Sequence, residues 1–165
     1  MKKLFTFLML MIFFSAFAQE NLPKNNDGKI TFSKIIELNG SKTELYQKIL
    51  QYTGQHFISA NNQIQYKDEN ESKVIAKQTE TVDFYGKPSK IFYNIIFDAK
   101  DEKVRVQITD ILFENNLKAF PAENYPKGWA GKKKFYSIIE DTSMSIIKHF
   151  EDKIKVNSSN NNDDW

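Results

Sequence analysis

Cysteine is absent from this chain of 165 residues, and glycine and proline are scarce. Without cysteine there is no disulfide framework, no thiolate metal site and no cysteine nucleophile. Six glycines and four prolines are too few for a low-complexity or collagen-like chain. A content of 41% hydrophobic and 27% charged residues is that of an ordinary globular protein, and the length indicates one domain.

Long hydrophobic runs are also missing, apart from one at the start of the chain. Two lysines precede an apolar run over 4–14, and Ala16-Phe17-Ala18 follows with small residues at the two positions of a signal cleavage site. The run is shorter than the ~20 residues that span a bilayer. We therefore expect residues 1–18 to be a signal peptide cleaved between Ala18 and Gln19. The protein would be exported, to the periplasm or the medium, with no stable membrane span after cleavage.

Arginine is nearly absent, since Arg105 is the only one in the chain. Removal of residues 1–18 takes away two lysines and no acid, which leaves 21 basic and 21 acidic residues. Arginine is the residue best suited to bidentate recognition of phosphate and guanine. A neutral, arginine-poor chain of this kind is a poor candidate for nucleic-acid binding, and we expect none.

Composition divides the chain into a core region and two polar ends. Residues 19–28 are polar and contain proline and Asn-Asp-Gly, so they predict a flexible leader. Residues 157–165 are low in complexity and predict a disordered tail. The region 29–156 between them is long enough to form a single domain without covalent cross-links.

The pattern of apolar residues predicts one strand, one helix, four strands and a last helix. Ser41 to Glu44 form a capping box that begins the first helix, which should end near Ala60. The strands are expected over 29–38, 63–67, 73–84, 91–98 and 104–109. Short turns between them, including 98–101, indicate antiparallel hairpins. The fold class is therefore α+β, with two helices on one face of a single five-stranded antiparallel sheet.

Two segments carry a resemblance to a known family. The strand that leads into Ser41-Lys42-Thr43-Glu44-Leu45-Tyr46, and the later Ile64-Gln65-Tyr66-Lys67-Asp68, resemble exported bacterial domains known as domain of unknown function 4468, with a TBP-like fold. The resemblance covers roughly residues 29–113 and, weakly, the last helix. It implies the fold of one TBP half and an exported setting, but no activity and no catalytic residues. Gripping DNA requires paired halves and a basic saddle, and neither is evident here.

The residues show no recognisable catalytic motif, metal site or cofactor site. The only histidines, His56 and His149, lie beside apolar residues of the two helices and are interpreted as packed or boundary residues. There is no Gly-x-Ser-x-Gly elbow, glycine-rich phosphate loop or EF-hand. The acidic clusters at 68–71 and 98–102 are interpreted as solvated turns. We infer that the protein is not an enzyme, and we expect no metal and no cofactor.

A first candidate contact surface is the face of the sheet that the helices leave open. In the strand 91–98, alternate residues can face the helices, which places Phe92, Asn94 and Ile96 on the other side. Arg105 and Gln107 alternate with apolar residues of the next strand in the same way. Apolar residues on an open face indicate a covered or contacted surface. The alternatives are ordinary scatter in a central strand, or a terminal segment lying across it.

A second candidate is the aromatic loop, residues 114–136, which carries Tyr125 and Trp129 together with Phe120 and Tyr136. Long loops in compact domains are often functional, and aromatic residues are enriched at contact surfaces. The alternative is an aromatic plug that closes the core. Lys132 to Lys134 would oppose the dipole of a helix beginning there, so we expect the last helix to begin later, at a capping box formed by Ser137 and Glu140. An anionic partner for these lysines is the other interpretation.

Together these features predict an exported, non-catalytic binding domain whose contact surface is the open sheet face, the aromatic loop, or both. The partner would be a protein, a glycan or a small apolar ligand. An envelope hydrolase whose site has no recognisable motif is one alternative. A structural envelope protein without a small ligand is another.

The export prediction is tested by the mass of the natural product. Protein recovered from the cell envelope or the medium should begin at Gln19, because the small residues before it form the cleavage site. Intact-mass spectrometry measures this. A recovered protein that still contains Met1 to Ala18 would contradict the prediction.

Overall fold

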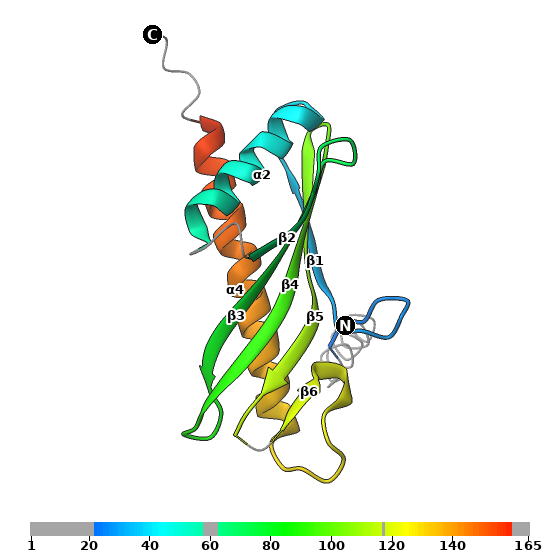
Figure 1. The fold of residues 1–165 in the computed structure, drawn as a ribbon, viewed down its shortest axis with the longest axis vertical. Helices are drawn as coiled ribbons and strands as arrows, with labels where there is room; N and C mark the ends of the chain where they lie inside the picture. Colours follow the sequence, from blue (N-terminus) through cyan, green and yellow to red (C-terminus); the bar gives the residue numbers. More distant parts are fainter. Residues whose placement is uncertain (1–21, 58–62, 117, 160–165) are drawn as a thin grey trace, which may run out of the picture.

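The computed structural model describes residues 22–57, 63–116 and 118–159. The expected signal peptide, its cleavage site at Ala18 and Gln19, and residues 160–165 of the expected tail lie outside these ranges. Within them, the chain forms one twisted open sheet with both long helices on the same face (Figure 1). Neither helix in the described part of the chain combines the length and apolar character needed to cross a membrane.

The sheet is antiparallel throughout, with the strand order β1-β5-β4-β3-β2. The sixth strand, β6, pairs with the last residues of β5, past the part of β5 that pairs with β1. The predicted α+β architecture is confirmed, with six strands in place of five. The additional strand has only three residues, too few for a pattern of alternation to reveal it. The elements are β1 (Phe32–Glu37), α2 (Lys42–His56), β2 (Ile64–Asp68), β3 (Lys73–Asp83), β4 (Pro88–Lys100), β5 (Lys103–Glu114), β6 (Ala119–Pro121), the short 3-10 helix η2 (Ala122–Asn124) and α4 (Lys132–Ser159).

The core lies between the sheet and the two helices. Every second residue of β4 from Ser89 to Ala99 is buried there, and α2 and α4 cover these side chains with one apolar stripe each. Tyr52 of α2 and Phe150 of α4 both contact Phe97, with ring centres 6.1 and 4.7 Å away. Because one face of the sheet is used for the core, the other face remains available to solvent.

Helix α2 begins as predicted. Ser41 is the N-cap residue, and it forms a capping box with Glu44, whose carboxylate accepts from the Ser41 backbone N–H at 2.7 Å. Hydrogen bonds from Ser41 lower the pKa of the Glu44 carboxyl group. Asp101, in the β4–β5 turn, accepts from the Lys42 backbone N–H at 2.7 Å. The start of α2 is therefore tied to the end of the central hairpin.

Several predicted boundaries need correction. Helix α2 ends at His56 instead of near Ala60, because Phe57 adopts an extended conformation and buries its ring in the core. The turn predicted over 98–101 is shorter, since β4 continues to Lys100 and the chain reverses at Asp101 and Glu102. Strand β5 runs to Glu114, well past the predicted end at 109.

A bulge at Asp110 explains why the pattern of β5 is misleading. Asp110 has a φ of 52°, and the pairing with β4 shifts by one residue between Phe92 and Asn94. Inward-facing residues are even-numbered before the bulge and odd-numbered after it, so Ile108 and Phe113 face the same core. A β-bulge adds one residue to one strand and reverses its alternation.

The two polar ends are more ordered than expected where the structure describes them. Residues 22–28 of the predicted flexible leader form a turn that pairs Lys24 with Ile30, and Leu22 is buried. Asn25 accepts the backbone N–H groups that close this turn. At the other end, residues 157–159 of the predicted disordered tail continue α4.

The last helix begins at Lys132, not at Ser137 as predicted. Gly131 directly precedes this helix, and its φ of 90° suits glycine. Its carbonyl accepts the first helical hydrogen bond, from the Phe135 N–H. Lys132 lies over the ring of Tyr136, and Lys134 lies over the ring of Tyr85 at 4.5 Å. These cation–π contacts offset the unfavourable position of the lysines at the helix start.

The two serines that sequence patterns marked as helix caps should respond differently to truncation. Ser41→Ala should lower the free energy of unfolding by about 1 kcal/mol, because it removes a true N-cap. Ser137→Ala should leave stability unchanged or raise it, since Ser137 lies inside α4 and alanine is the better helix former. Urea denaturation of both variants measures this. Equal losses for the two would contradict the assigned start of α4.

Candidate functional site on the open sheet face

The open face is defined here as the side of the sheet opposite α2 and α4. Five of the predicted site residues lie on it: Phe92, Asn94 and Ile96 on β4, and Arg105 and Gln107 on β5. Pairing places Ile96 directly opposite Gln107. These side chains are half-buried or exposed, whereas the alternate residues of both strands are buried under the helices.

Apolar side chains are spread across this face from one edge of the sheet to the other. Ile35 of β1 is 57% exposed and Tyr66 of β2 is 41% exposed. Tyr66 pairs with Ile75, which pairs with Ile96, so an apolar row crosses three strands. Directly opposed side chains in such a row contact one another. Phe92 lies further along β4, next to Leu112 of β5.

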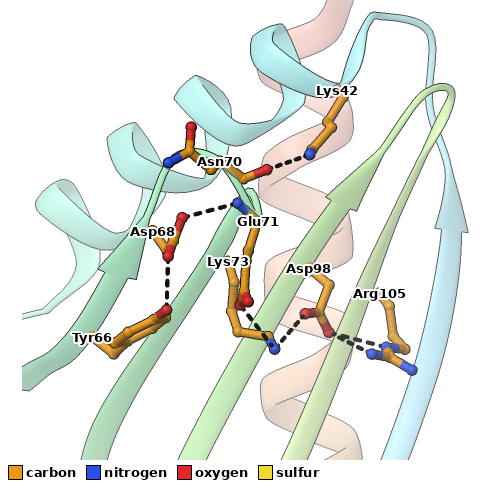
Figure 2. A network of polar contacts seen from close by, with 8 residues as sticks. All are labelled: Lys42, Tyr66, Asp68, Asn70, Glu71, Lys73, Asp98 and Arg105. Atoms are coloured by element: carbon orange, nitrogen blue, oxygen red, sulfur yellow. Dashed lines mark hydrogen bonds and ion pairs between the residues drawn. The ribbon is translucent and has the colours of Figure 1, made fainter.

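Strand pairing places a row of charged residues beside the apolar row. Figure 2 shows the contacts within this charged row. Arg105 donates from Nε and Nη2 to one oxygen of Asp98, at 3.1 and 2.8 Å, and Lys73 approaches the other oxygen at 3.7 Å. The Asp98 side chain is only 16% exposed. Asp98 thus lies within β4 and forms ion pairs with residues of both neighbouring strands, β3 and β5. The prediction that it lies in a solvated turn is therefore wrong.

Asp68 of β2 lies at the outer end of the row of charged residues. Its carboxylate accepts from the Glu71 backbone N–H and from the Tyr66 hydroxyl, both at 2.9 Å (Figure 2). These two hydrogen bonds lower the pKa of the Asp68 carboxyl group, and the bond to Asp68 raises the pKa of Tyr66. The ring of Tyr66 is therefore fixed in orientation although much of it is exposed.

Asn94 has a structural partner on the same face. Its side-chain amide donates to Asp110 at 3.1 Å, and Asp110 also forms an ion pair with Lys29. Asn94 therefore supports the bulge in β5, and Asp110 links the bulge to Lys29 in the segment that precedes β1.

A small hollow of about 220 Å³ lies at the β1 side of this face. It is lined by Ile35, Asp98, Lys100, Lys103 and Arg105. Lys100 and Lys103 stand directly opposite each other at the end of the β4–β5 hairpin, and both are exposed. Like charges in directly opposed positions repel each other. Glu37 of β1 stands opposite Lys103 on its other side and offsets one of the two charges, so the corner keeps an excess of positive charge that favours an anionic group.

The two remaining predicted site residues, Tyr125 and Trp129, lie in a separate aromatic cluster. Both rings contact Phe120, which is buried, and Tyr125 also packs against Phe135 at the start of α4 with ring centres 4.8 Å apart and the rings tilted. The Tyr125 hydroxyl donates to the Ala130 carbonyl at 2.6 Å. This packing matches the plug interpretation of the aromatic loop, and burial raises the pKa of Tyr125.

The family to which the chain belongs follows from its comparison with known proteins. A family model described as a domain of unknown function (DUF4468) with TBP-like fold matches residues 32–114. The chain belongs to this family. The match spans β1 through β5, and so includes all the strands that build the open face. No curated protein matches the chain.

Two solved structures share the fold of this DUF4468 domain. A TBP-like protein from Parabacteroides distasonis superposes with a TM-score of 0.70 at 15% identity, over 80% of this chain and 96% of that one. A DUF4468 family protein from Bacteroides ovatus superposes with a TM-score of 0.58 at 16% identity, over 81% and 91%. At these identities the likeness concerns the fold alone.

Sequence reasoning missed several residues of the open face. Ile35 is one of them. The pattern of β1 was interpreted through Ile36, which faces inward, although the same alternation places its neighbour Ile35 on the outward side. The sequence pattern places Lys73 at the start of one strand and Asp98 at the end of another, each next to a turn. Their pairing depends on the register of three strands, which no local pattern of residues specifies.

The packing of Trp129 can be tested by fluorescence. In a Trp165→Phe variant, Trp129 is the only tryptophan. Because its ring is half-buried against Phe120 and Tyr125, its emission should be blue-shifted and protected from iodide. Emission like that of free tryptophan, with unhindered quenching, would show that the ring does not pack as described. Unfolding in urea gives the exposed reference within the same sample.

Proposed function

We propose that this DUF4468 domain is an exported, non-catalytic binding domain that contacts another protein through the open face of its sheet. The observation that carries the proposal is the exposure of apolar side chains, Ile35 and Tyr66 above all, on a face that no described helix covers. Antiparallel sheets commonly have one solvated face of polar residues. Apolar residues retained on such a face are typical of an interaction surface.

The shape of the face favours a protein over a small ligand. Small-molecule sites are typically clefts of about 300 Å³ or more that enclose most of the ligand. The hollow at Ile35 and Arg105 measures only about 220 Å³. An extended surface with a central apolar row and a charged border instead resembles the core and rim of a protein interface.

The charged residues of the open face indicate which chemical groups the surface of a partner should carry. Asp98 is already paired with Arg105 and Lys73, and Asp68 is held by Tyr66 and the backbone of Glu71. Lys100 and Lys103 stand opposite each other at the hairpin end, and Glu37 of β1 stands on the other side of Lys103. We expect the partner surface to carry an apolar patch beside at least one acidic side chain that comes between these two lysines.

The ionisation of the described carboxyl groups supports a non-catalytic role. A general acid in a hydrolase requires a raised carboxyl pKa. The carboxyl groups with a resolved shift are Glu44, Asp68 and Glu151, and in each the pKa is lowered by hydrogen bonds from neighbouring groups. These bonds have structural explanations: a helix cap for Glu44, a turn for Asp68, and for Glu151 ion pairs with Lys155 of the same helix and with Lys34 of β1.

Photo-crosslinking in the cells that naturally make the protein tests the proposal. A photoreactive residue replacing Ile35 should give a discrete crosslinked protein, while one replacing Met144 of α4 should not. The two positions are 57% and 50% exposed, so they are matched in access but lie on opposite faces. Equal crosslinking from both, or none from Ile35, would contradict the proposed surface.

A charge reversal tests the expected chemistry of the partner. Lys103→Glu should reduce crosslinking from position 35 severalfold, because it repels an acidic partner residue. Lys148→Glu, on the exposed side of α4, should leave crosslinking unchanged. A crosslink insensitive to Lys103→Glu would argue against an acidic border on the partner.

A further inference from the structure

The two histidines of the chain, far apart in sequence, meet in the structure. His56 lies in the last turn of α2 and His149 in the second half of α4, and their ring centres are 5.3 Å apart. Tyr52, which is buried, stacks on the His56 ring at 4.5 Å and also contacts His149 at 6.2 Å. This pairing joins α2 to α4 on the side of the sheet opposite the open face, with His56 half-buried and His149 exposed.

The protonation of His56 is determined by its hydrogen bond. Nδ1 lies 3.0 Å from the backbone carbonyl of Tyr52 in the preceding turn. A carbonyl only accepts, so Nδ1 carries the hydrogen and the neutral ring keeps its lone pair on Nε2. Metal-binding histidines usually donate their other ring N–H in this way, which orients the ring and makes the ligating nitrogen more basic.

The histidines border a hollow whose charge favours a cation. The hollow measures about 310 Å³, and Gln78 and Glu80 of β3 line it together with the two imidazoles. Both β3 side chains accept from the hydroxyl of the buried Tyr93, at 3.1 and 3.3 Å. Among the described residues that line the hollow, Glu80 is the only carboxylate, so it places a negative charge beside the two histidine rings.

We propose that His56 and His149 together bind one divalent transition-metal ion. An ion held about 2.0 Å from each imidazole nitrogen in tetrahedral geometry places the two ring centres roughly 5 Å apart. The observed separation already matches this requirement. The His149 side chain is exposed, so its ring can turn to direct a nitrogen at the ion opposite Nε2 of His56.

Two imidazoles define the class of ion and the character of the site. Imidazole suits Zn²⁺, Cu²⁺ and Ni²⁺, whereas Mg²⁺ and Ca²⁺ prefer oxygen ligands. Among the residues that the structure describes, no group of three or more His, Asp or Glu side chains is arranged to hold a metal. Water completes the coordination, and the ion exchanges readily. Because the ligands come from different helices, the bound ion links α2 to α4.

The experiment titrates the untagged protein with Zn²⁺ and with Cu²⁺ at pH 7.5. One ion should bind per chain, Zn²⁺ should raise the melting temperature, and the Cu²⁺ EPR spectrum should show coupling to two nitrogen nuclei. His149→Gln should weaken Zn²⁺ binding at least about tenfold, as expected when a metal site loses part of its ligation. It should also reduce the coupling to one nitrogen. His56→Gln should have the same effect, and Gln55→Ala, beside it on the exposed side of α2, should have none.

The outcomes are separable because the sequence contains no other histidine. His149 is exposed, so His149→Gln keeps the test meaningful even if His56→Gln fails to fold. Zn²⁺ affinity unchanged in His149→Gln, or a Cu²⁺ spectrum with fewer than two coupled nitrogens in the unmodified protein, would overturn the proposal. Photo-crosslinking from Ile35 is unaffected by either result, since it reports on the opposite face.

Discussion

The one-sided burial of strand β4 is the constraint on which the rest of the structure depends. Its inward positions carry large apolar side chains that are almost completely buried, and their removal from water is the dominant favourable contribution to folding. Both helices must lie on that side to cover them. No helix of the described residues covers the opposite side of β4, and Phe92 and Ile96 remain there as half-buried apolar residues. The open face is thus a direct consequence of how the core is built.

Local patterns predicted the parts of the fold that depend on nearby residues. The alternation in β4 and the capping box of Ser41 and Glu44 involve residues two to four positions apart, and both are found as expected. The start of α4 was predicted wrongly because the lysines at its first turn are stabilised by rings, one of them Tyr85 from the β3–β4 turn. Contacts of this kind between distant segments leave no periodic signal in the sequence.

The residues of the candidate site divide in the same way, into those that a local pattern predicts and those that only the folded structure brings together. Which residues of β4 and β5 face outward could be predicted as far as the bulge, because alternation has a period of two. Beyond it, Asp110 reverses the phase, and only the three-dimensional pairing reveals this. The row from Lys73 through Asp98 to Arg105 depends on the registers of β3, β4 and β5, and the meeting of His56 with His149 depends on how α2 and α4 pack. These arrangements are set by the global fold.

Strand β3 joins the two surfaces for which roles are proposed. Lys77 points to the open face, opposite Asn94, while the next residue, Gln78, points beneath the helices and accepts from Tyr93. Burial raises the pKa of Tyr93 strongly and that of Tyr52 to about 12, so both hydroxyls stay neutral and act only through hydrogen bonds and packing. A partner on the open face would contact side chains that alternate with those of the histidine hollow and share no atoms with them. Any coupling between the two would have to pass through the backbone of β3 and β4, which are paired along their length. The two surfaces are therefore expected to function independently, and substitutions in one are the natural controls for the other.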